Sequence, residues 1–218
     1  MQKAYTILYI HGMGGGGDSR IPSILRQYFG GNGIPAAFSI DVICRTYSFD
    51  PEVASDQIQG WMSELQPDMV IGESLGALHA LRLRNIPVIL ISPALNAPFY
   101  FELLSWMTLI PGITPLFDRI YRPKEGDRQP LHFTHSVLRK YLSHRKKALE
   151  NLPEMRRSLH AFFGTSDHYR RSGVVSIKSW KKRYGNTYTL YDGSHYTEEE
   201  HIYSLLIPKI LDILVYNK

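Results

Sequence analysis

The sequence predicts an α/β protein with three layers, in which helices cover both faces of a mostly parallel sheet of about six strands. Two observations lead to this class. Short apolar runs alternate with longer segments of helical period, and most of these runs are continuously apolar. Strands of that kind are buried on both faces, as in parallel sheets. The length suits a single domain over 1–218 that carries one insertion.

The first half of the chain supplies four predicted strands, and a turn or a helix start follows each of them. These strands are Tyr5 to Ile10, Ala37 to Cys44, Met69 to Ile71 and Pro87 to Ser92. The helices between them end at about Phe29, Leu65 and Arg84. The second of these helices opens at Asp50-Pro51, with proline at its first position. The crossovers between parallel strands should be right-handed.

The alternation stops after the fourth strand and resumes near residue 159. Residues from about 97 to 153 have an apolar start, a Pro- and Gly-punctuated middle and a basic helical end, which predicts a helical cap insertion. The last part of the chain holds two strands with a helix between them, and then a final helix. They are Leu159 to Phe163, Thr187 to Tyr191, Val174 to Tyr184 and Glu198 to Tyr216, the last with a kink or break at Pro208.

Composition excludes several classes. No apolar stretch is long enough to span a bilayer, and the N-terminus lacks the pattern of a signal peptide. The single cysteine, Cys44, cannot form an internal disulfide, so we expect a cytoplasmic protein. The net charge of +5 raises the question of nucleic acid. No nucleic-acid motif accompanies the basic runs, which are typical of solvated helix faces, and we expect no such partner.

The segment Gly72-Glu73-Ser74-Leu75-Gly76 lies where the third strand turns into a helix. A turn that sharp forces unusual backbone angles on its central residue, and glycine two positions to either side relieves the crowding. The serine hydroxyl then projects above the sheet at a helix N-terminus, where developing negative charge is favoured. A helix-capping serine in a tight turn is the simpler reading. The context favours Ser74 as a nucleophile.

A serine nucleophile needs a base, usually a histidine that a carboxylate orients. In parallel sheets functional groups gather at the carboxyl ends of the strands. Asp167 follows the fifth predicted strand and His195 follows the sixth, so the order is Ser74, Asp167, His195. Asp192 is an alternative acid, although its position three residues before His195 favours a turn. The other histidines near these positions are His168, His201 and His79.

Attack on an acyl carbon creates a negative oxygen that needs two N–H donors. The amide of Leu75, directly after the nucleophile, supplies one. The glycine-rich loop from His11 to Gly17 should supply the other, with Met13 preferred and Gly14 second. The same loop could cradle a phosphate, but it lacks the G-K-[ST] ending of a P-loop and a clear G-x-G-x-x-G spacing.

Together these segments resemble the α/β-hydrolase superfamily, and within it the small, compact bacterial serine esterases. The matching segments are His11-Gly12 with its loop, residues 72–76, Gly164 to Asp167 and Gly193 to His195. The resemblance implies acyl transfer to water through a serine ester. It implies that Ser74 attacks, His195 acts as base and then acid, and Asp167 orients the imidazole. No metal and no organic cofactor are implied.

The expected substrate is a small-molecule carboxylic ester or thioester. The apolar start of the insertion, from Phe99 to Ile110, is either an acyl-binding wall or the core of the cap, with neither favoured. An acyltransferase, a lipase or a peptidase would use the same three side chains. A catalytically silent scaffold that binds a ligand or partner also remains open, because fold does not fix function.

Overall fold

A computed structural model describes residues 3–31, 38–123, 125–150 and 159–216. Six strands form one sheet in the order β2-β1-β3-β4-β5-β6, and every neighbouring pair is parallel. The strands are β1 Lys3–Ile10, β2 Phe38–Cys44, β3 Met69–Glu73, β4 Val88–Ile91, β5 Leu159–Gly164 and β6 Tyr188–Tyr191. The predicted α/β class and strand number are confirmed. The Ala37 end of the predicted second strand lies outside the described residues.

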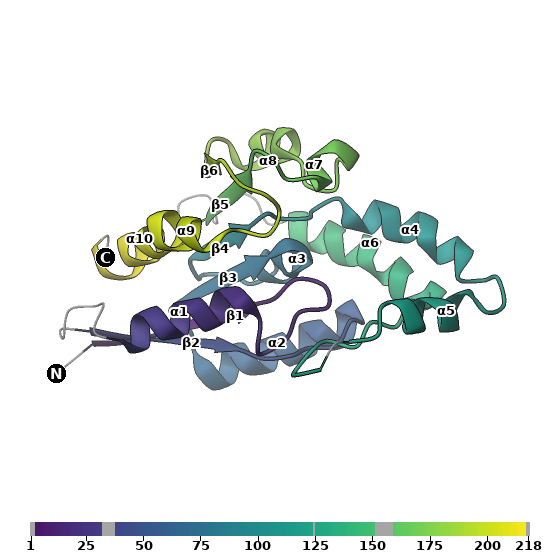
Figure 1. Cartoon of the computed structure of the whole chain (residues 1–218), viewed down its shortest axis with the longest axis horizontal. Helices are drawn as coiled ribbons and strands as arrows, with labels where there is room; N and C mark the ends of the chain where they lie inside the picture. The colour runs from purple at the N-terminus through teal and green to yellow at the C-terminus, as the bar shows by residue number, and fades with distance from the viewer. Residues whose placement is uncertain (1–2, 32–37, 124, 151–158, 217–218) are drawn as a thin grey trace.

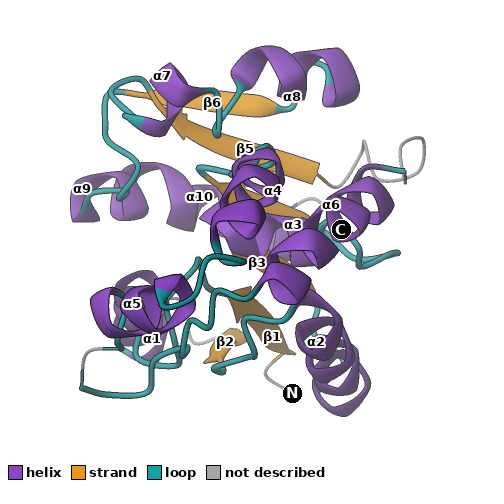
Figure 2. Ribbon diagram, turned by 90° about the vertical axis from the view of Figure 1, so that its right-hand side faces the viewer, coloured by secondary structure: helices purple, strands orange, loops and turns teal. Residues whose placement is uncertain are grey.

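Helices cover both faces of this sheet, so the fold has the three predicted layers (Figures 1 and 2). The first face carries α1 Arg20–Gly30 and the C-terminal helical run, in which α9 Glu199–His201 and α10 Ile207–Leu211 alternate with π-helical turns at Ile202–Leu206 and Asp212–Tyr216. The second face carries α2 Pro51–Leu65, α3 Ala77–Ala80 and α8 Ile177–Tyr184. Each face has its own core of buried apolar side chains.

Local signals set the helix starts. Asp50 caps α2 by accepting a hydrogen bond from the Glu52 amide at 3.0 Å, and Pro51 follows it at the first helical position, as predicted. The helix predicted from Ser74 to about Arg84 is wrong in length, because α3 ends at Ala80. After that helix the backbone forms turns closed by hydrogen bonds between residues i and i+3, and Asn85 then adopts the left-handed region at φ 58°. This exit returns the chain to β4.

The insertion holds three helices, α4 Ala97–Met107, α5 Ile113–Ile120 and α6 His135–Leu149, and its described residues, up to 150, contain no strand. The predicted end at residues 151–153 lies outside the described part of the chain. Helices α4 and α6 pack against each other beside the sheet (Figure 1). A further short helix, α7 Tyr169–Ser172, follows β5 and was not predicted. Among the described helices, none has the length and apolarity to cross a membrane.

Candidate active site

The turn between β3 and α3 has the sharp geometry that the sequence predicts. Ser74 adopts φ 49°, in the left-handed region that a residue with a side chain rarely enters. A Cβ on Gly72 would lie 2.8 Å from the Ala80 Cβ, and one on Gly76 would lie 2.4 Å from the His11 carbonyl oxygen. Both glycines are therefore required by close packing. The strain at Ser74 costs about 1–3 kcal/mol and persists because the surrounding strands and helix fix it.

Ser74, His195 and Asp167 meet at the carboxyl ends of the strands. The Nε2 atom of His195 lies 3.0 Å from Ser74 Oγ, and its Nδ1 atom lies 2.8 Å from Asp167 Oδ2. With Asp167 as the acceptor, Nδ1 of His195 would donate and Nε2 would be left to accept the serine hydroxyl. The other Asp167 oxygen accepts the Tyr169 amide at 2.8 Å. His195 and Asp167 are both buried, which fixes the imidazole in this orientation.

The competing candidates lie elsewhere. Asp192 is exposed, and its carboxylate accepts a hydrogen bond from the Thr165 hydroxyl at 3.2 Å. The His168 ring is exposed, with its centroid 6.1 Å from that of His195. The His201 ring packs on that of Tyr191, with the two centroids 4.7 Å apart. His79 is buried in α3, and burial lowers its pKa well below the usual value.

The glycine-rich loop after β1 leaves few amides free. The Gly14 amide donates to the Gln129 side chain at 3.1 Å, the Gly15 amide to the Gly12 carbonyl at 3.0 Å and the Gly16 amide to Ser19 Oγ at 2.9 Å. Gly14, the second choice for an oxyanion donor, is therefore occupied. The amides of Met13 and Leu75 have no hydrogen bond to another described residue, and both residues line the cavity in front of Ser74.

A residue that sequence reasoning missed, Gln129 of the insertion, holds this loop. Its side chain is buried; it accepts from Gly14 and donates to the Tyr47 carbonyl at 3.1 Å. The backbone amide of Gln129 also donates to the Gly15 carbonyl at 2.6 Å. The neighbouring backbone lies so close that a Cβ on Gly16 would meet the Asp127 carbonyl oxygen at 1.6 Å. The repeated glycines therefore allow the insertion to pack on the loop, and no local sequence pattern signals this contact.

Glu73, directly before the nucleophile, was also missed. Its carboxylate accepts the Tyr9 hydroxyl at 2.8 Å. Burial raises the pKa of Glu73 above its ordinary value, while the Tyr9 hydrogen bond opposes that rise. Glu73 thus joins β1 to the nucleophile turn.

A cavity of about 650 Å³ opens in front of Ser74 and His195. Its walls come from the glycine-rich loop, the start of α1, the inner side of α4 and the loop after β5. Tyr100 and Phe101 of α4 and Tyr169 and Val174 beyond β5 make much of the wall apolar, while Arg20 and Arg128 add charged side chains to it. The size and lining suit a small organic molecule with an apolar part. Within the described residues no cluster of His, Cys, Asp and Glu suits a metal ion.

No protein-family model matches the chain, and no curated protein matches it in sequence. Solved structures do match. A monoacylglycerol lipase from Paleococcus ferrophilus superposes on 97% of this chain and 96% of its own, with a TM-score of 0.61 and 15% identity. A structure from work on LipS and LipT, two metagenome-derived lipolytic enzymes, superposes on 97% of this chain and 94% of its own, with a TM-score of 0.61 and 14% identity. Est1E from Butyrivibrio proteoclasticus, with ferulic acid bound, covers 96% and 88% with a TM-score of 0.57 and 13% identity. At these identities the likeness is one of fold.

Proposed function

We propose that this chain, whose fold is that of the α/β hydrolases, is a serine hydrolase that cleaves a carboxylic ester or thioester through an acyl-enzyme intermediate. The observation that carries the proposal is the continuous hydrogen-bonded line from Asp167 through His195 to Ser74. A serine hydroxyl becomes nucleophilic when a held imidazole takes its proton, and this arrangement provides that base. The strained turn presents the hydroxyl to the cavity.

The proposed reaction has two halves. His195 Nε2 takes the Ser74 proton as Oγ attacks the acyl carbon, and the resulting oxyanion accepts hydrogen bonds from the Met13 and Leu75 amides. His195 then gives the proton to the departing alcohol or thiol, which leaves Ser74 acylated. Water repeats the sequence, with His195 again as base, and releases the acid and the free serine. Asp167 holds the imidazole and stabilises its charged form throughout. The chemistry uses neither a metal nor an organic cofactor.

The cavity supports a small-molecule substrate with an apolar acyl or alcohol part. Its volume of about 650 Å³ is within the usual range for such ligands, and α4 contributes aromatic side chains to its wall. The names of the structural neighbours, a monoacylglycerol lipase and lipolytic enzymes among them, fit ester cleavage. The single cysteine, which is buried and unpaired, fits a cytoplasmic location.

Turnover of short p-nitrophenyl esters tests the proposal. The Ser74→Ala variant should lose about five to six orders of magnitude in kcat, because the three groups act as a unit. A fluorophosphonate probe should label the wild type and fail to label Ser74→Ala. Absence of both turnover and labelling in a folded wild-type protein would favour a silent scaffold.

A matched pair of variants, at Asp167 and at Asp192, tests which carboxylate orients His195. Asp167→Asn should lower kcat by about four orders of magnitude, because the amide no longer fixes the tautomer of His195. Asp192→Asn, at an exposed carboxylate in the adjacent turn, should leave kcat within a few-fold of wild type. The reverse outcome would assign the role to Asp192.

A further inference from the structure

Helix α4 is apolar on the side that faces the protein and also on the side that faces away. Its inner residues, such as Phe101 and Leu104, pack against the core. Its outer residues Leu103 and Trp106 are 69% and 56% exposed. A helix that is apolar all round is normally buried on all sides, in a protein core or in lipid. The outer side of α4 therefore lacks its usual partner in the described structure.

The exposed apolar surface continues beyond α4. The turn after the helix exposes Leu109 and Ile110, and α5 adds Ile120. We define the docking face as six side chains, each at least 46% exposed: Leu103, Trp106, Met107, Leu109, Ile110 and Ile120. From residue 97 to residue 117 the sequence has a single charged residue, Glu102. Continuous exposed apolar surface of this kind marks an interaction site.

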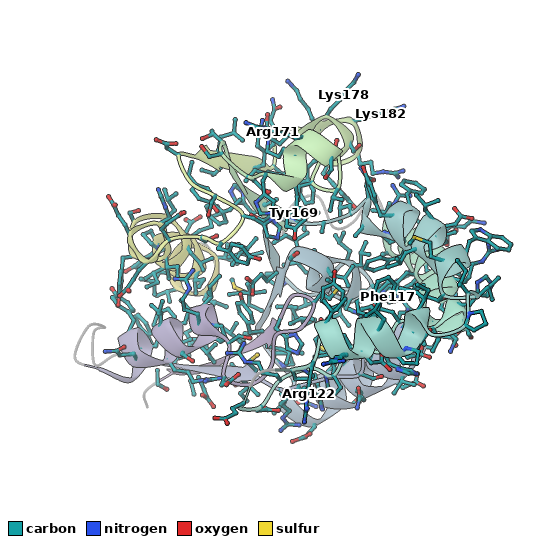
Figure 3. The ribbon with its side chains drawn as sticks, turned by 45° about the vertical axis from the view of Figure 1, so that its right-hand side comes forward. Phe117, Arg122, Tyr169, Arg171, Lys178 and Lys182 are labelled. Atoms are coloured by element: carbon teal, nitrogen blue, oxygen red, sulfur yellow. The ribbon has the colours of Figure 1, made fainter. Side chains whose placement is uncertain are left out.

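Cationic side chains border the docking face. The Arg139 guanidinium lies 5.6 Å from the Trp106 ring centre. Arg119 is exposed in the last turn of α5, and Arg122 projects from the α5 side of the molecule (Figure 3). Aromatic and aliphatic side chains beside arginine and lysine are the composition of segments that lie in a membrane interface.

The charge of the whole chain is concentrated in the same segment. Residues 97–147 contain nine Lys or Arg and four Asp or Glu, which is a net charge of +5. The rest of the chain has 16 Lys or Arg and 16 Asp or Glu, so its net charge is zero. Arg128 and Lys140 pair with carboxylates outside this segment, whereas Arg119, Arg122 and Lys146 are exposed. An anionic surface complements these exposed cations, and pairing of two copies through this face would bring like charges together, which opposes a dimer.

The docking face also adjoins the candidate active site. Ala97, Tyr100 and Phe101, on the same helix, line the cavity in front of Ser74. Tyr169, which Figure 3 labels, lines the cavity from the start of α7. A surface that contacts α4 from outside would therefore lie next to a wall of the cavity.

We propose that the docking face binds the surface of an anionic phospholipid bilayer. The apolar side chains of α4 and α5 enter the boundary between headgroups and acyl chains, and Arg119, Arg122 and Arg139 contact the headgroups. The protein lies on the membrane and does not span it. The binding depends on this face and not on Ser74.

Sedimentation of the full chain with vesicles tests the proposal. The protein should bind vesicles of phosphatidylglycerol and phosphatidylcholine in equal parts, and bind pure phosphatidylcholine vesicles much more weakly. Tryptophan emission should shift to the blue on binding, because Trp106 leaves water, while Trp180 is already buried and Trp61 lies on α2, outside the docking face. Replacing Arg119 and Arg122 by Gln should weaken binding to the anionic vesicles about 30-fold, since each cation near an anionic leaflet contributes about fivefold.

Matched variants separate the face from general surface apolarity. Leu103→Ser with Ile110→Ser should weaken vesicle binding at least tenfold. Val53→Ser with Leu190→Ser removes two apolar side chains that are 47% and 48% exposed on α2 and β6, and should leave binding unchanged. Ser74→Ala should bind like the wild type, so failure of the proposed catalysis is separable from failure of docking.

Three outcomes would overturn the proposal. The first is no binding to the anionic vesicles, and the second is equal loss of binding in both double variants. The third is a dimer in sedimentation velocity that Leu103→Ser with Ile110→Ser dissociates while vesicles bind neither form, which would assign the face to a second copy.

Discussion

Gln129→Ala tests whether the insertion positions the proposed oxyanion donor. The truncation removes the acceptor of the Gly14 amide and the donor to the Tyr47 carbonyl. Each polar group left without a partner costs about 1–3 kcal/mol, so we expect the free energy of unfolding to fall by about 3 kcal/mol. The Met13 amide, next to the released Gly14, should then no longer point steadily toward the position of the oxyanion. Since removal of one oxyanion donor costs about 10²–10³ in kcat, a partly displaced donor should cost about 10- to 100-fold.

Urea unfolding measures the first effect, and kcat and KM for a p-nitrophenyl ester measure the second. KM should change little, because the donor acts mainly on the charged intermediate. Gln57→Ala is the matched control: that glutamine accepts the Ser48 amide at 2.8 Å on an exposed surface. It should cost less than about 1 kcal/mol and leave kcat unchanged. A Gln129→Ala protein that is destabilised but keeps kcat within twofold of wild type would refute the positioning role.

Two further predictions concern stability. Gly76→Ala should prevent stable folding, because its Cβ would lie 2.4 Å from the His11 carbonyl oxygen. The control Gly60→Ala, in open space on α2, should raise the free energy of unfolding by about 0.5–1 kcal/mol. Thermal melts compare the two variants, and a stable Gly76→Ala protein would contradict the packing. Burial lowers the pKa of His11 to about 4 and that of His144 to about 3. Both bind protons in the unfolded chain at about pH 6.5, so stability should fall as the pH falls through 6.5 toward 4, by about 2 kcal/mol per histidine between pH 7 and pH 5. His11→Gln should reduce that loss by about the same amount in urea unfolding, and an unchanged loss would contradict the assignment.

The inner strands of the sheet were predictable because they are buried on both faces, and burial is visible as uninterrupted apolar runs, whereas the edge strands β2 and β6 keep exposed positions. The segments of residues 5–10 and 87–92 show this directly. Helix lengths were less predictable. The end of α3 at Ala80 depends on where the chain must re-enter the sheet, and the residues after it are compatible with a longer helix.

The candidate site divides in the same way. Ser74, Asp167 and His195 were found because the topology fixes which loops meet at one edge of a parallel sheet. Their catalytic roles stay a prediction. Gln129 was not predictable, because it is a single polar residue more than a hundred positions away in the sequence from the loop it contacts (|i−j| = 115 to Gly14), and nothing in its local sequence marks the contact.

The close approach of residues 127–129 to the glycine-rich loop bears on how the protein could be altered. Engineers often shorten a cap to admit bulkier compounds. Here such a deletion would remove the residues that hold the glycine-rich loop in its conformation, so a shortened chain should lose activity instead of accepting more substrates. Acceptance of larger molecules would have to come from smaller side chains at positions such as Tyr100, with residues 127–129 kept in place.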